Sequence, residues 1–125
     1  MRDQDSGDCI EIKKRLLTIV KKTRKSSQTL IRIACHELET FYLGDLEAIE
    51  KGLEINIKAQ NTQKKKKYRN PDNIMNPSHG LINLTRKKYY KIKGSRNIAP
   101  QLKLDGSNRS HSFNCLISGL KTMID

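Results

Sequence analysis

Long apolar runs, aromatic residues and tryptophan are scarce or absent in this chain of 125 residues. Aromatic residues make up 5% of it, and the hydrophobic residue types together reach 35%. Globular domains usually contain roughly 45–50% apolar residues, glycine included, so we expect a small core. The uninterrupted apolar runs are only a few residues long, whereas roughly 20 apolar residues are needed to cross a bilayer. The sequence therefore excludes a transmembrane helix, and its short length excludes a multidomain enzyme.

Cysteine is also scarce, because the chain has only Cys9, Cys35 and Cys115. An odd number of cysteines at wide spacings argues against a disulfide framework and fits a reducing compartment. Residues 1–8 carry three aspartates, and no apolar segment follows a basic one, so the pattern of a secretory signal peptide is missing. We therefore expect an intracellular protein, with the nucleus among the destinations that a basic chain allows.

Patterns for metal binding and catalysis are incomplete. His111 and Cys115 have the spacing of the last two ligands of a zinc knuckle, but no Cys-x-x-Cys precedes them. His36, Glu37 and Glu39 lack the second histidine of a His-Glu-x-x-His helix. No glycine-rich phosphate-binding loop is recognisable either. We therefore predict no metal site, no cofactor and no enzymatic activity.

Positive charge is what the chain has in excess, with 25 Lys+Arg against 13 Asp+Glu and a formal net charge of +12. Residues 1–60 contain eleven cations and ten acids, whereas residues 61–125 contain fourteen cations and three acids. Such asymmetry is typical of a foldable segment joined to a basic arm. It also indicates a polyanionic partner. We place the boundary near Gln60.

The first sixty residues have the apolar spacing of helices. In residues 8–23 the apolar side chains recur on one stripe, which predicts an amphipathic helix with a basic face. Residues 31–42 repeat the pattern and predict a second helix. We expect Gly44 to end it in a left-handed conformation and Asp45 to cap the next helix.

That next helix begins at Leu46, but its end is ambiguous. Gly52 weakens a helix, and Leu53, Ile55 and Ile57 alternate as in a short strand. Residues 1–60 are therefore predicted to form a helical unit of two or three helices.

Residues 61–104 have a different character. Their cations face a single acid, Asp72, and the stretch contains all three prolines of the chain. We therefore predict a basic, largely irregular arm or linker, with a short strand over residues 81–92 as the only candidate for order. In residues 105–125 the apolar side chains again form one helical stripe, which predicts a short amphipathic helix. The predicted fold class is mainly α.

Two basic stretches of the arm supply the candidate binding residues. Residues 64–69 hold five cations in six positions, and residues 86–93 hold five more together with two tyrosines. Cations neutralise phosphates and release counterions, while tyrosine rings stack on unpaired bases. The predicted nucleic-acid-binding residues are Lys64, Lys65, Lys66, Lys67, Tyr68, Arg69, Arg86, Lys87, Lys88, Tyr89, Tyr90, Lys91, Lys93 and Arg96.

The interpretation that follows is a non-catalytic accessory protein that binds RNA or DNA through this arm. The alternative is a helical protein-interaction or dimerisation module that works through its apolar stripes. In that case the basic stretch is a localisation signal or a solubiliser, since residues 64–67 match a simple nuclear localisation pattern. The basic face of the first helix leaves attachment to an anionic membrane surface as a third candidate.

Overall fold

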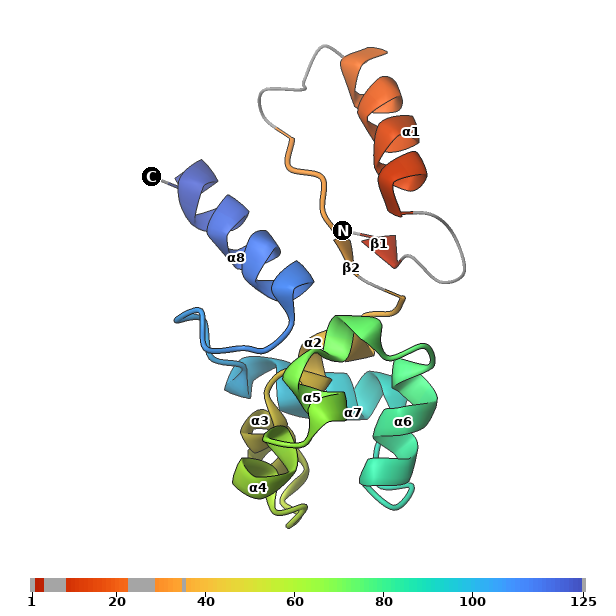
Figure 1. Cartoon of the computed structure of the whole chain (residues 1–125). Coiled ribbons are helices and arrows are strands. Elements are labelled where there is room, and N and C mark those ends of the chain that lie inside the picture. Colours follow the sequence, from red (N-terminus) through yellow and green to blue (C-terminus); the bar gives the residue numbers. More distant parts are fainter. Residues whose placement is uncertain (1, 4–8, 23–28, 35, 125) are drawn as a thin grey trace.

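The chain is mainly helical in its structure, a computed structural model that describes residues 2–3, 9–22, 29–34 and 36–124. Helices α2 to α7 form a body, and helices α1 and α8 extend from one side of it (Figure 1). No helix within the described ranges is long and apolar enough to cross a membrane.

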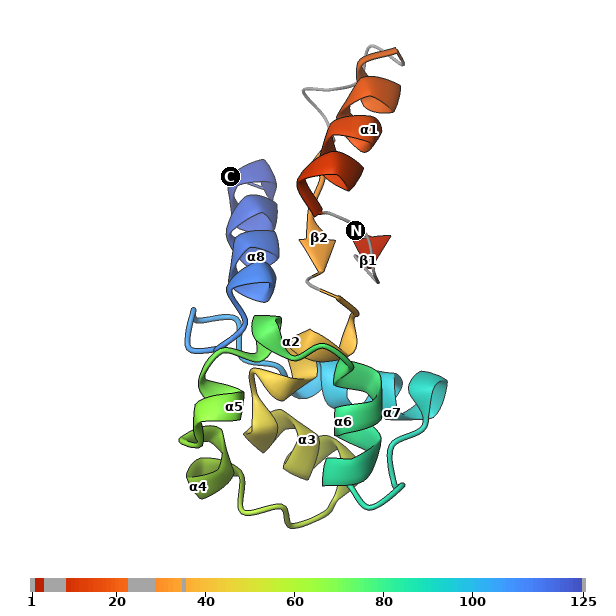
Figure 2. The ribbon, with the colours of Figure 1, turned by 45° about the vertical axis from the view of Figure 1, so that its right-hand side comes forward.

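The extension is built around two very short strands. Strand β1 (Arg2–Asp3) pairs in parallel with β2 (Ile33–Ala34), and Arg2 lies opposite Ile33. Helix α1 (Cys9–Lys22) lies where the first amphipathic stripe predicts a helix. Helix α8 (His111–Ile124) runs beside β2, as Figures 1 and 2 both show. Arg32, the residue before β2, links this segment to α8, because its Nε donates to the Cys115 carbonyl at 3.3 Å.

The body consists of short helices around one core. Its elements are α2 (Glu39–Leu43), α3 (Leu46–Leu53), α4 (Ala59–Gln63), α5 (Lys66–Arg69), the 3-10 turn η2 (Pro71–Asn73), α6 (Pro77–Leu84), α7 (Lys91–Ile98) and the 3-10 turn η3 (Ala99–Gln101). The fully buried core side chains are Leu43, Leu46, Ile49, Leu81 and Ile98. Both halves of the sequence therefore contribute to the same core.

The predicted second helix is wrong over most of its length. Residues 33–34 are extended, His36 has a left-handed φ of 64°, and α2 begins only at Glu39. The stretch from Leu30 to Ala34 is apolar enough to serve as a strand, and its pairing with β1 decides between the two structures.

The junction that follows is partly as predicted. The Asp45 carboxylate accepts a hydrogen bond from the Ala48 amide, which caps α3 as expected. Gly44, however, has a right-handed φ of −81°. It is needed for a different reason, because an added Cβ would collide with the Asn108 side chain and lie 2.7 Å from the Ser110 amide nitrogen.

The predicted irregular arm is also wrong, because residues 61–104 contain most of α4, all of α5 to α7, and two 3-10 turns of the body. Its prolines do not prevent helices: Pro71 and Pro77 are the first residues of η2 and α6, where the missing N–H costs no hydrogen bond. Leu81 and Ile98 are fully buried, while the cations point outward. The predicted strand over residues 81–92 is instead the end of α6, a connection and the start of α7.

Candidate functional site

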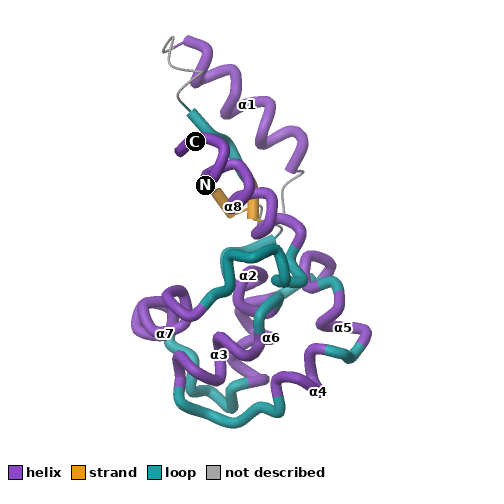
Figure 3. Tube along the Cα trace, turned by 90° about the vertical axis from the view of Figure 1, so that its left-hand side faces the viewer, coloured by secondary structure: helices purple, strands orange, loops and turns teal. Residues whose placement is uncertain are grey.

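The first basic stretch lies on and before α5. Its cations Lys64, Lys65, Lys66, Lys67 and Arg69 are exposed. Tyr68 is buried in the body, and the Lys67 ammonium lies 5.6 Å from the centre of its ring. Figures 2 and 3 show α4 and α5 on one side of the body and α7 on the other. Helix α5, which carries most of the first stretch, therefore lies apart from α7, which carries part of the second.

The second basic stretch forms the connection from α6 to α7 and part of α7 itself. The exposed cations here are Arg86, Lys87, Lys88, Lys91, Lys93 and Arg96. Tyr90 is also exposed, with 67% of its surface accessible. These residues are available to a ligand.

The predicted role of Tyr68 and Tyr89 in stacking is not supported by their positions, since both rings are buried. The Tyr89 hydroxyl donates to Glu39 Oε1 at 3.1 Å inside the body. Burial raises the pKa of Tyr89, a hydrogen bond with Ser95 lowers it, and the Glu39 carboxylate raises it. Sequence spacing alone does not distinguish this tyrosine from its neighbour Tyr90.

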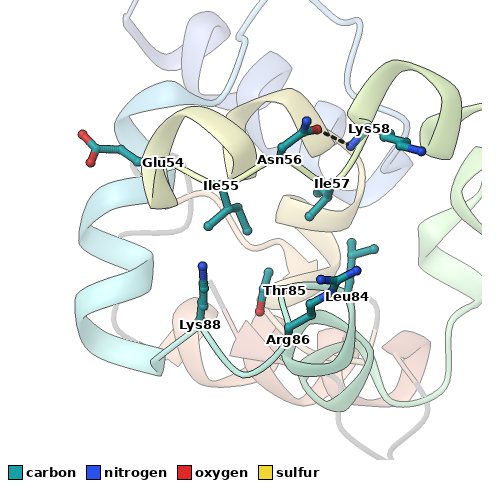
Figure 4. A pocket seen from close by; sticks show the side chains of 9 residues that line it. All are labelled: Glu54, Ile55, Asn56, Ile57, Lys58, Leu84, Thr85, Arg86 and Lys88. Carbon is teal, nitrogen blue, oxygen red and sulfur yellow. Dashed lines mark hydrogen bonds between the residues drawn. The ribbon is translucent and has the colours of Figure 1, made fainter.

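A hollow of about 550 Å³ lies between the loop after α3 and the end of α6 (Figure 4). Figure 4 shows Ile55 and Ile57 facing Thr85, Arg86 and Lys88 across it. The full lining is Glu54, Ile55, Asn56, Ile57, Lys58, Leu84, Thr85, Arg86 and Lys88. The lining thus combines an apolar floor with three cations and one acid.

A second hollow of about 390 Å³ adjoins the first, because Glu54 and Lys88 line both. Its other lining residues are Gly52, Leu53, Tyr90, Lys93, Gly94 and Asn97, from α3 and α7. We refer to the two hollows together as the basic groove.

Local hydrogen bonds fix both walls of the basic groove. On the first wall, the Ile57 amide donates to the Glu50 carboxylate at 2.9 Å and the Lys58 amide to Asn56 Oδ1 at 3.0 Å. On the second wall, the buried Thr85 hydroxyl donates to the Leu81 carbonyl at 2.9 Å and accepts from the Tyr89 amide at 3.2 Å. The cations are therefore carried on constrained backbone.

Backbone strain is concentrated around the first hollow. In the described part of the chain, five non-glycine residues have positive φ. Three of them line this hollow, namely Glu54 (55°), Lys58 (52°) and Arg86 (53°), and a fourth, Lys87 (65°), lies between two lining residues. Glycine adopts this conformation without the steric cost that a side chain brings. All four positions instead carry a charged residue.

The groove cations, like the exposed cations of residues 64–69, have no ion pair in the described part of the chain. Among the described residues, no hydrogen bond or ion pair joins the side chains of Lys58, Arg86, Lys88 or Lys93 to another protein group. By contrast, Lys103 Nζ lies 3.3 Å from Asp45 Oδ1 and 2.9 Å from Glu47 Oε2. The groove cations are therefore able to bind an external anion.

Sequence reasoning missed the wall formed by residues 54–58, and Asn97 in the second hollow. Lys58 is an isolated cation in a segment of balanced charge, so no local signal marks it. The fold brings it near the second basic stretch, across the first hollow.

The other sequence candidates lie elsewhere. His111 and Cys115 form a pair on α8, with 3.3 Å between Nε2 and Sγ. Glu37 accepts from the Ser78 amide at 3.4 Å, and Glu39 is fully buried. Within the part of the chain that the structure describes, no three His, Cys, Asp or Glu side chains are grouped as a metal site requires. Cys35 lies outside the described residues.

Comparison with known proteins places the chain in one family. The family model described as "Domain of unknown function (DUF4276)" matches residues 3–121, so the chain belongs to this family. No curated protein and no solved structure matches the chain.

Proposed function

We propose that this protein is a non-catalytic nucleic-acid-binding accessory protein and that the basic groove holds the phosphate backbone of its ligand. The observation that carries the proposal is the set of cations around one hollow, two of them on left-handed backbone and none of them paired with another described residue. A polyanion is the ligand that such a set favours, because each phosphate contact releases counterions.

The remaining candidate cations lie near the basic groove or apart from it. Lys87, Lys91 and Arg96 are exposed near the groove, on the connection and on α7. The five cations of residues 64–69 are exposed on and before α5, apart from α7 (Figure 2), and we assign them no part in the basic groove.

A matched pair of double variants tests the proposal. Arg86→Gln with Lys88→Gln removes two groove cations, and Lys65→Gln with Lys66→Gln removes two cations from α5 and the residue before it. Both variants have the same net charge. We expect the groove variant alone to weaken binding of a labelled oligonucleotide strongly in fluorescence anisotropy. The slope of log K against log salt should fall in magnitude by about 0.7 for each phosphate of a single strand that the variant no longer neutralises.

The two possible failures differ in meaning. Equal weakening in both double variants would show that binding follows net charge and would overturn the groove as the site. Absence of salt-dependent binding by the unmodified chain would overturn nucleic-acid binding itself.

A second candidate function rests on the apolar residues at the end of α8. Leu120, Met123 and Ile124 are exposed there, on a helix that extends away from the body (Figure 1). They favour the alternative of a protein-interaction or dimerisation module. Sedimentation velocity at several concentrations tests it, with Leu120→Glu on α8 and Ile92→Glu on α7 as the matched pair. A dimer that only the α8 variant dissociates would support this candidate.

A further inference from the structure

We infer that the ligand of the basic groove is single-stranded and that the Tyr90 ring stacks on one of its unpaired bases in the second hollow. This inference deepens the proposed function and rests on it. It assigns different parts of the groove to the base and to the phosphates.

Tyr90 differs from every other aromatic residue of the chain. The chain has four tyrosines, two phenylalanines and no tryptophan, and all six aromatic residues lie in the described part. Five of them are buried, whereas Tyr90 is 67% exposed. An exposed aromatic ring beside available cations is the combination with which proteins bind single strands, since any unpaired base can stack on it.

The position of Tyr90 fits this role. It precedes the first turn of α7 and lines the second hollow with Lys88 and Lys93. Lys88 also lines the first hollow, where Arg86 and Lys58 lie. A strand that follows these cations therefore passes the hollow that Tyr90 shares with Lys88 and Lys93.

The acid of the groove, Glu54, lines both hollows. Figure 4 shows the Glu54 carboxylate pointing away from the other side chains of the first hollow. A carboxylate repels phosphate, but it accepts hydrogen bonds from the exocyclic amino group of a base such as cytosine. Asn97 adds an amide that both donates and accepts. The second hollow is thus suited to a base edge, and the first to phosphates.

Duplex DNA does not satisfy this arrangement. Its bases are paired and stacked inside the helix, so a ring on the protein surface reaches them only after they are unpaired. Duplex binding would use the cations alone.

The test compares Tyr90→Ala and Tyr90→Phe in the full chain. The probes are a fluorescein-labelled twelve-nucleotide oligodeoxycytidylate and a duplex of the same length, titrated at low and high salt. We expect Tyr90→Ala to weaken single-strand binding by roughly 5- to 150-fold, the range that removal of one stacked base implies, and to leave duplex binding unchanged. Tyr90→Phe keeps the ring and should bind like the unmodified chain.

Each contrary result has its own meaning. If Tyr90→Ala binds the single strand normally while the Arg86/Lys88 variant does not, the stacking inference is overturned and the proposed function stands. If Tyr90→Ala weakens both probes equally, the selectivity for single strands is overturned. If the unmodified chain binds neither probe, the proposed function fails and the inference with it. Because Tyr90 is exposed, its substitution should leave the fold intact, which circular dichroism of both variants checks.

Discussion

Arg86 and Lys87 end helix α6 in a backbone conformation that glycine adopts at lower cost. Their φ angles are 53° and 65°, and the Lys87 amide donates to the Ile82 carbonyl at 2.8 Å, which closes the end of the helix. Glycine is the common residue at such helix ends. Both residues therefore reduce stability after the end of α6, where Arg86 supplies charge to the basic groove.

We therefore expect glycine to change the stability in opposite directions at the neighbouring residues Lys87 and Lys88. Lys87→Gly should raise the free energy of unfolding by up to about 1 kcal/mol, because it relieves the left-handed backbone. Lys88→Gly should lower it by about 0.5–1 kcal/mol, because φ is not positive there and glycine adds chain entropy to the unfolded state. Urea denaturation of both variants measures the difference. A decrease in the stability of Lys87→Gly would show that the left-handed backbone at Lys87 does not cost stability.

At the scale of elements, the groove depends on close packing between α3 and α7. Gly52 of α3 lies directly against α7, where an added Cβ would come within 2.6 Å of the Asn97 carbonyl oxygen and 2.8 Å of the Ile98 Cα. Both atoms belong to the backbone, so neither can move away as a flexible side chain would. Glycine is required here for close approach of two helices.

We therefore expect substitution by alanine to change the free energy of unfolding in opposite directions at Gly52 and Gly80. Gly52→Ala should lower the free energy of unfolding by about 1–3 kcal/mol, because it forces α7 away from α3. Gly80→Ala lies within α6, where no atom is within 4 Å of the added Cβ, and should raise it by about 1 kcal/mol through helix propensity. Thermal unfolding of the two variants is the measurement. Equal shifts of Tm would contradict the packing of α7 on α3.

The length of each helix explains whether its pattern can be recognised in the sequence. The regions of α1 and α8 carry long amphipathic stripes, and α3 has a capping aspartate, so their patterns are visible locally. Helices α4 to α7 are four to eight residues long, which is too short for a periodic pattern. Such short helices are stable only through tertiary packing.

At the scale of the whole molecule, buried tyrosines couple stability to alkaline pH. Burial raises the pKa of Tyr42, Tyr68 and Tyr89 above the ordinary value of 10.0. Above pH 10 the unfolded chain releases these protons while the folded chain retains them. The stabilising contribution is therefore complete below about pH 10 and is lost as the pH rises further.

We expect the free energy of unfolding to fall above pH 10 by up to about 1.4 kcal/mol per pH unit for each of these tyrosines. Urea denaturation between pH 8 and pH 11 measures the fall. Tyr68→Phe removes one titrating group, so its stability should depend less steeply on pH. Identical pH profiles for this variant and the unmodified chain would show that Tyr68 does not contribute to the loss of stability above pH 10.

The sequence by itself determined the helical class and the excess of cations after residue 60, because each is a local property of composition or spacing. Only the tertiary structure decided that residues 61–104 belong to the body, that Tyr89 is buried and Tyr90 exposed, and that Lys58 lies near Arg86. The physical reason is that these facts depend on contacts between residues far apart in the chain. Leu81 and Ile98 pack with Leu43 and Leu46, and no local pattern specifies that packing.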